Sequence, residues 1–297
     1  MKKMRSAGDR IFDVFNYCFL SVLSMVALYP LIYVFSMSIS SEEAVKTNAV
    51  RLWPVGFSLT SFGKAIRTDG LGLAYYNTVV YVIIGTTLSI LVTMMFAYAL
   101  SRPKFVLRRG LSVYIIITML FSGGLIPLFM VIRTLGIYNT RWAVILPALS
   151  SVWNLIISRV FIQQNISESL IESAYIDGYN DIGIFARIVM PLSKQIIAII
   201  GLYQAVYFWN QYFQSMIFAP DKRIAPLQII LIEILLRNSM QSQAQQLGDA
   251  QAIANQLLYM LQAKYVIILM SILPIIMVYP FIQKYFVKGV MIGSVKE

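Results

Sequence analysis

The sequence predicts an all-α integral membrane protein with six transmembrane helices, and three observations support this fold class. Of its 297 residues, 59% are hydrophobic and 12% charged, which leaves too little polar surface to coat a soluble globule. Six apolar stretches reach the roughly 20 residues that a helix needs to cross a bilayer core. Apart from Asp13, at the entrance of the first stretch, no acidic residue falls within them. The predicted spans lie near residues 12–40, 77–101, 111–133, 141–162, 194–218 and 265–286.

The first span follows a basic start at residues 2–10, which would also suit a signal peptide. Its apolar run is too long, and no small-residue cleavage site followed by polar sequence is visible, so we read it as a retained helix. A second basic cluster, at residues 102–109, separates spans two and three. Because Lys and Arg concentrate in cytoplasmic loops, both clusters predict that side, and both termini then lie inside.

Prolines and glycines interrupt the later spans. Gly123 and Gly124 precede Pro127 in the third span, Pro147 lies in the fourth and Pro274 in the sixth. Such residues weaken the backbone hydrogen-bond ladder and often kink a helix. For a single proline, ordinary packing irregularity is the simpler interpretation. As a set, these residues indicate helices that bend around a cavity.

The connections complete a single transmembrane domain over residues 1–297. Residues 41–76 and 219–263 form outer loops, the first with turn signals at Trp53-Pro54 and Asp69-Gly70. In the second, an amphipathic helix is expected near residues 227–236 and a further helix in the Gln-rich stretch that follows. Residues 164–193 form a cytoplasmic loop. We find no internal repeat and no soluble domain that would hold a nucleotide.

Composition also excludes several kinds of site. The chain has no histidine and a single cysteine, Cys18, so a His-ligated or thiolate metal centre and an internal disulfide are not expected. The formal charge of +11 could suggest nucleic acid. However, basic cytoplasmic loops produce the same balance, and no basic stripe interleaved with exposed aromatics is present. Membrane lipids rather than nucleic acid are therefore expected around this chain.

The loop at residues 164–193 is unusual because it is acidic. It carries Glu168, Glu172, Asp177 and Asp181 where a cytoplasmic loop normally favours Lys and Arg. We predict a short helix capped by Ser167, a turn at Gly178, and a second short helix capped by Asn180 that leads to Pro191. The loop could simply cap its own bundle. It is too apolar for a solvated connection and too acidic for lipid headgroups, which favours a docking surface for a protein.

The same loop resembles a known motif. Glu172, Ala174, Gly178, Ile188 and Pro191 have the spacing of the EAA motif in permease subunits of bacterial ATP-binding-cassette (ABC) importers. Asp177 before the glycine, and Phe185 three residues before Ile188, resemble the carbohydrate-uptake branch. Ser173 and Met190 are mild departures. Residues 121–127, 135–140 and 279–296 are similar to the LplC-like branch, which includes alginate- and pectin-oligosaccharide permeases.

This resemblance implies a type I ABC importer permease of MetI-like architecture in the bacterial cytoplasmic membrane. It implies a second permease subunit, two ATPase subunits and an extracytoplasmic solute-binding protein. This chain would be non-catalytic and hold no cofactor, since ATP and Mg belong to the ATPase. Glu172 and Asp177 would be polar anchors of the ATPase joint, Gly178 its bend, and Phe185 with Ile188 its apolar contact. The tail after Lys288 would reach the same interface, or anchor the chain through its lysines.

A solute path is expected along the fifth span. Sugars stack on aromatic rings and hydrogen-bond to amides, so Tyr203, Gln204, Tyr207 and Asn210 suggest a path for an oligosaccharide. Trp209 joins this group, although an aromatic belt at the membrane interface explains it equally well. A second cluster comprises Trp153 and Asn154 in the fourth span.

The resemblance to alginate and pectin permeases implies that the expected solute is negatively charged. Without a mid-span Lys or Arg, its charge would need neutralisation by partners or by Arg133 and Arg141 near the outer mouth. An importer of another solute is the alternative. An ion-coupled secondary transporter would place a carboxylate at mid-membrane, and an intramembrane enzyme would need a nucleophile and base. The sequence has neither a mid-span acid nor any histidine.

Overall fold

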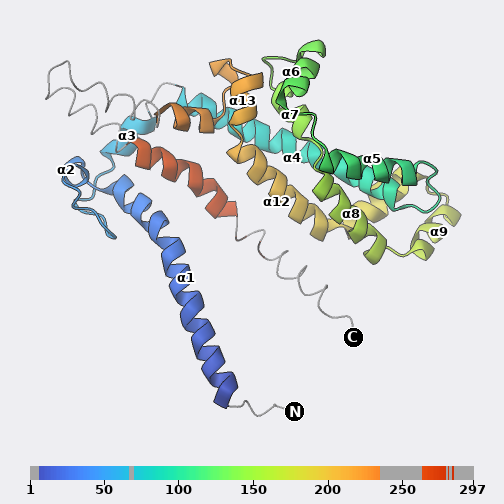
Figure 1. The fold of residues 1–297 in the computed structure, drawn as a ribbon, viewed down its shortest axis with the longest axis horizontal. Coiled ribbons are helices and arrows are strands. Elements are labelled where there is room, and N and C mark those ends of the chain that lie inside the picture. Colours follow the sequence, from blue (N-terminus) through green and yellow to red (C-terminus); the bar gives the residue numbers. More distant parts are fainter. Residues whose placement is uncertain (1–6, 67–69, 235–262, 279, 281–282, 284–297) are drawn as a thin grey trace. The chain divides into compact units, whose positions relative to one another are not determined.

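The computed structural model describes residues 7–66, 70–234, 263–278, 280 and 283, which form helices and turns without a strand among them (Figure 1). The described residues divide into two compact units. One is drawn from residues 1–69 and 231–273, and the other from residues 70–230 and 274–297.

The first unit is built on α1 (Ala7–Ile39), a 33-residue apolar helix. Short helices α2 (Glu42–Lys46) and α3 (Thr60–Ile66) follow it. The segment between them folds back on the end of α1, where Ser58 N–H donates to Ile39 O (2.9 Å). This unit has a small buried core, against which Tyr33 and Tyr265 pack. The core comprises Met37, Ala44, Val45 and Val50. Tyr265 belongs to the apolar helix Ala263–Val278.

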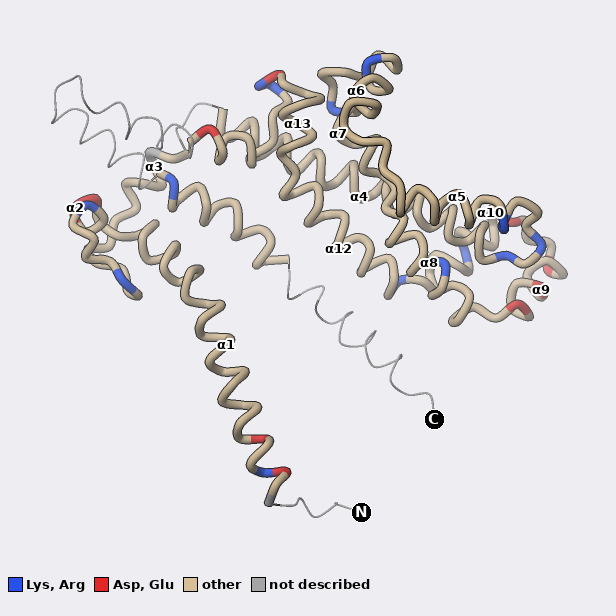
Figure 2. Tube along the Cα trace, viewed as in Figure 1, with Lys and Arg blue, Asp and Glu red and all other residues tan. Residues whose placement is uncertain are grey.

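The second unit is organised around α4 (Leu71–Ser101), with α12 (Lys194–Asn210) and α8 (Val152–Asn165) packed along it (Figure 1). Gly85 of α4 leaves room for a ring of α12, because a Cβ there would lie 2.4 Å from the ring of the buried Phe208. Figure 2 shows α4 without charged residues along its length, while Lys, Arg, Asp and Glu gather near α9 and α10. This pattern suits helices whose middle parts lie in lipid.

Shorter helices flank this bundle. They are α5 (Arg108–Leu120), α6 (Leu125–Thr134), α7 (Trp142–Ile145) with the 3₁₀ turn η1 (Leu146–Ala148), α13 (Phe213–Phe218) and the 3₁₀ turn η3 (Lys222–Ile224). Buried Asn77 on α4 donates to the carbonyls of Arg223 (2.9 Å) and Ala225 (3.1 Å), and accepts from Arg141 (2.7 Å). These bonds fix the segment around η3 on the first turns of α4.

Two of the six predicted spans are unbroken helices, Gly8–Ile39 and Leu71–Ser101, by length and apolar composition. Two bent pairs, Trp142–Ala148 with Val152–Asn165 (46°) and Asp181–Leu192 with Lys194–Asn210 (82°), raise the possible number to four among the described residues. The end of the sixth predicted span, near residues 279–286, lies mostly outside them.

The third predicted span, residues 111–133, is not continuous. Helix α5 ends at Leu120 and α6 begins at Leu125, because Gly124 adopts φ +85°, which a helix cannot continue through. The fifth, predicted to residue 218, stops at Asn210. Gln211 there is extended, and its Oε1 accepts from Ser215 Oγ (3.1 Å), so α13 starts as a separate helix.

Candidate coupling loop and solute pocket

The coupling loop, residues 164–193, begins with α9 (Glu168–Ile176). Ser167 caps this helix, with its Oγ accepting from Leu170 N–H (3.4 Å). At the other end, Tyr179 N–H donates to Ala174 O and Gly178 N–H to Tyr175 O, both at 3.0 Å. This pair of bonds is a Schellman motif, whose turn residue has a left-handed backbone. Gly178 has φ +86° and open space around it, so the backbone, not packing, requires glycine here.

The second part of the loop begins with α10 (Asp181–Ile184). Asn180 caps it, as the sequence predicts, with its Oδ1 accepting from Gly183 N–H (2.8 Å). The chain continues through a π-helical turn, η2 (Phe185–Val189), into α11 (Met190–Leu192), where Pro191 is exposed. A bend of 82° then leads into α12. The loop therefore has the helix–turn–helix form expected from its residue types.

One face of the loop packs against the bundle. Ile171, Ala174, Ile184 and Val189 are buried in a cluster with residues of α4, α8 and α12. Phe185 and Ile188 pack against the same cluster, and the Phe185 ring lies 5.8 Å from that of Tyr98. Both side chains are only partly buried, so their contact with the ATPase stays a prediction.

Two other apolar residues of the loop are more exposed to solvent. Ile176 is 86% exposed and Ile182 77% exposed, on either side of the turn at Asp177 and Gly178. The sequence reasoning missed both. Their position beside the predicted turn was the available signal. Asp177 is exposed at the same tip.

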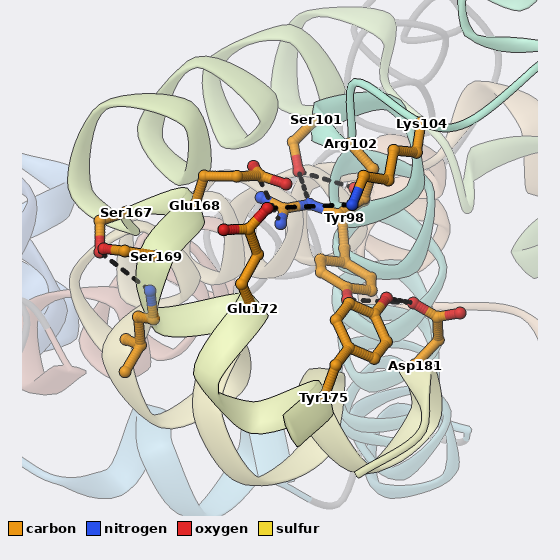
Figure 3. A network of polar contacts seen from close by, with 11 residues as sticks. Tyr98, Ser101, Arg102, Lys104, Ser167, Glu168, Ser169, Glu172, Tyr175 and Asp181 are labelled. Carbon is orange, nitrogen blue, oxygen red and sulfur yellow. Dashed lines mark hydrogen bonds and ion pairs between the residues drawn. The ribbon is translucent and has the colours of Figure 1, made fainter. Parts of the chain in front are cut away.

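A polar network joins the loop to the C-terminal end of α4 (Figure 3). Glu168 Oε2 lies 3.3 Å from Arg102 Nη1. Asp181 Oδ1 accepts from Tyr175 (2.5 Å) and Tyr98 (3.4 Å). The hydrogen bond to Asp181 is the main cause that raises the pKa of Tyr175 above its ordinary value.

Glu172, the first residue of the predicted motif, behaves differently. Its carboxylate lies 3.8 Å from Lys104 Nζ, and both side chains are more than half exposed. Such a solvated pair contributes little and is easily exchanged for another partner. Glu172 is thus accessible to an approaching protein, as is Asp177.

A pocket of about 470 Å³ lies between α8, η1 and α12, and five of the seven residues predicted for the solute path line it. Gln204 is buried and its Nε2 donates to Ala148 O (2.5 Å), while Asn154 is 4% exposed. The partly exposed rings of Trp153, Tyr203 and Tyr207 complete the group. The remaining lining residues, which the sequence reasoning missed, are Pro147, Ala148, Ser150 and Ser151.

Trp209 and Asn210, also predicted for the path, do not line this pocket. Trp209 is 7% exposed and meets the Tyr75 ring edge-on at 5.7 Å, which also argues against an aromatic belt for it. Asn210 donates to Val206 O on its own helix (3.0 Å). On this helix Trp209 lies on a different face from positions 203 and 207, whereas Asn210 follows 203 and 207 at helical spacing but is the last residue of α12 and lies outside the pocket.

The arginines expected near the outer mouth have structural contacts. The Arg133 guanidinium lies over the rings of Phe129 (5.8 Å) and Tyr138 (5.4 Å), and Arg141 donates to Asn77. Neither lines the pocket. Within the described part of the chain, no three Asp, Glu or Cys side chains gather to hold a metal ion.

Comparison with known proteins gives concordant results. Residues 85–292 match the family described as binding-protein-dependent transport system inner membrane component. The polygalacturonan/rhamnogalacturonan transport system permease protein YtcP of Bacillus subtilis is 38% identical over 97% of this chain and 99% of its own length. Protein LplC of the same organism is 34% identical, with 97% and 96% covered. A crystal structure of a bacterial ABC transporter involved in the import of the acidic polysaccharide alginate contains a chain with 35% identity and a TM-score of 0.85, covering 96% of this chain and 100% of that one.

Proposed function

The chain belongs to the family of inner membrane components of binding-protein-dependent transport systems, and we propose that it forms half of an ATP-driven import path for an oligosaccharide. The observation that carries this proposal is the pairing of two sites in one helical unit. A pocket of aromatic rings and amides suits a sugar, and an acidic loop with exposed isoleucines suits a protein partner.

The family description implies the partners. A binding protein delivers the solute, a second permease subunit completes the path, and two ATPase subunits hold ATP and Mg. This chain is then a non-catalytic subunit in the bacterial cytoplasmic membrane. Its docking tip consists of Ile176, Asp177 and Ile182, with Glu172 beside it, and closure of the ATPase dimer moves the loop as a rigid body.

The solute is proposed to be acidic because of what the relatives transport. YtcP is described as a polygalacturonan/rhamnogalacturonan permease, and the similar crystal structure concerns alginate import. Because Arg133 and Arg141 are engaged elsewhere, charge neutralisation falls to the partner permease and the binding protein. The pocket of this chain supplies stacking surfaces and amide groups.

The pocket is tested by removing its amides. Gln204→Leu and Asn154→Leu leave the sugar hydroxyls without partners, so uptake by the reconstituted importer should fall about tenfold for each, the discrimination that one lost polar contact gives. Asn210→Leu is the matched control, since this exposed amide on the same helix lies outside the pocket. Initial rates of labelled oligogalacturonate uptake are the measurement. Equal uptake by all three variants would exclude the pocket from the path.

The proposed topology places both termini and the coupling loop in the cytoplasm. Single cysteines at positions 105, 137 and 180, in a Cys18→Ser chain, should give labelling by a membrane-impermeant maleimide in intact cells at 137 alone. After the cells are opened, 105 and 180 should react as well. Labelling of position 180 in intact cells would place the loop outside and defeat the coupling role.

A further inference from the structure

The two outermost carboxylates of the coupling loop are tied to one helix of the same chain. Glu168, at the start of α9, pairs with Arg102, whose side chain is only 11% exposed. The guanidinium also lies over the Tyr98 ring at 5.4 Å. Asp181, at the start of α10, accepts from the hydroxyl of that same tyrosine and from Tyr175 (Figure 3). Tyr98 lies in the last turn of α4, and Arg102 is the residue directly after the end of this helix.

We infer that Glu168 and Asp181 are positioning residues that carry displacement of the coupling loop to the C-terminal end of α4. The inference rests on the proposed function, because it assumes that an ATPase moves the loop. It divides the acidic loop into two pairs with different tasks. Glu172 and Asp177 are available to the partner, whereas Glu168 and Asp181 bind the loop to its own bundle.

A cavity explains why polar ties are needed at this contact. About 700 Å³ of space lies between the loop and the end of α4. It is lined from α4 by Met95, Tyr98 and Ala99, from the next turn by Arg102, Lys104 and Phe105, and from the loop by Glu168, Tyr175, Asp181, Ile182, Phe185 and Ala186. Close-packed side chains transmit displacement because they resist compression, and a cavity of this size lacks that property. The contacts of Glu168 and Asp181 lie along this cavity, beside the apolar cluster in which Ala97, Tyr98 and Leu100 of α4 pack with the loop.

Apolar contacts hold the other face of the loop. Ile171 and Ala174 are buried in the cluster that includes Leu155 and Ile162 of α8 and Ala97 and Leu100 of α4. Removing the polar ties should therefore leave the loop folded and attached, while the side of the loop that faces the cavity is held less firmly against the end of α4. A helix that is attached but loosely positioned can bind an ATPase without transmitting its motion.

Helix α4 is a suitable receiver because it contacts both helices that line the solute pocket. It packs along α12, which carries Gln204, and along α8, which carries Asn154. Gly85 and Phe208 bring α4 and α12 together, and Ile90 lies against Gly201. Displacement at the end of α4 is thus delivered through close-packed contacts to the walls of the pocket.

The inference is tested by removing the Arg102–Glu168 ion pair and replacing it with a covalent bridge in the complete reconstituted importer. In a Cys18→Ser background, Arg102→Cys with Glu168→Cys should keep ATPase binding and basal ATP hydrolysis. The amount of oligogalacturonate imported per ATP should fall about tenfold, within the range by which positions between coupled sites act. A short bis-maleimide bridge between the two cysteines should restore import to within about threefold of the parent chain. Lys104→Ala is the matched control, because its exposed pair with Glu172 should not matter.

The milder variants Glu168→Gln and Asp181→Ala serve if the double cysteine chain does not assemble. Combined in one chain, they should lower import per ATP without changing ATPase binding. Unchanged import per ATP in the combined variant, or import that stays low after bridging, would overturn the inference. Failure of the proposed function would look different, because the parent importer itself would then show no import that depends on ATP and binding protein.

Discussion

Replacement of Ile176 and Ile182 by Asp is expected to separate this chain from its ATPase while leaving the membrane part folded. Both side chains are exposed, at 86% and 77%, so the substitutions remove little surface that is buried within the described chain. At a docked interface, however, each would bury a carboxylate next to Asp177. Loss of an anchoring side chain at an interface costs about 2 kcal/mol or more, which is about thirtyfold in affinity. The double variant should therefore lose its ATPase during co-purification.

A control of the same chemistry is available nearby. Val106, between α4 and α5, is 93% exposed and belongs to the basic segment predicted to share the cytoplasmic side. Val106→Asp should co-purify with the ATPase as the parent chain does. If the double variant at 176 and 182 also retains its ATPase and transports normally, the tip of the coupling loop is not the docking site.

Gly85→Val is expected to destabilise the membrane bundle strongly, because this glycine of α4 lies against the ring of Phe208 on α12. Even the Cβ of alanine would lie 2.4 Å from two ring carbons of Phe208, which is fully buried. Valine adds two methyl groups to that overlap, so α4 and α12 must separate. Overpacking of this kind costs about 1–3 kcal/mol, and we expect the upper end of that range. A lowered thermal unfolding temperature of the purified chain in detergent is the measurement.

Substitutions at two other glycines provide controls with smaller expected losses of stability. At Gly201 an added Cβ would meet only the end of the Ile90 side chain at 3.1 Å, so Gly201→Ala should be mild. At Gly110, on α5, nothing lies within 4 Å, and Gly110→Ala should be neutral or slightly stabilising, since alanine favours helix. Phe208→Leu should partly rescue Gly85→Val. Equal unfolding temperatures for Gly85→Val and Gly110→Ala would contradict the close contact of α4 and α12.

Much of the architecture could be predicted from the sequence because the membrane imposes it. Apolar length and the placement of charges located the ends of the long helices α1 and α4 closely, although both helices begin one to two turns before the predicted spans. The breaks within the third and fifth spans were less accessible. Gly124 signalled a kink, but only the backbone shows that its positive φ ends the helix. The residues near position 211 do not indicate that the backbone of Gln211 is extended and divides α12 from α13.

The site residues show a similar division. Turn chemistry predicted the caps at Ser167 and Asn180 and the bend at Gly178, since these depend on local backbone geometry. The exposure of each side chain depends on tertiary packing, so the sequence does not indicate that Phe185 and Ile188 are partly buried while Ile176 and Ile182 are exposed. For the solute pocket, residue type selected Gln204 and Asn154, which are buried and line it, but also Trp209 and Asn210, which do not line it. Residue type alone does not show which part of the helix surface faces the pocket.

The central claim is that this chain forms an oligosaccharide path driven by ATP through the coupling loop. It is tested most directly by initial uptake of labelled oligogalacturonate into proteoliposomes that contain this chain, its partner permease and the ATPase. We predict uptake that requires both internal ATP and external binding protein, and that is lost when Ile176 and Ile182 are replaced by Asp. Uptake that follows an ion gradient without ATP, or that persists in the double variant, would contradict the claim.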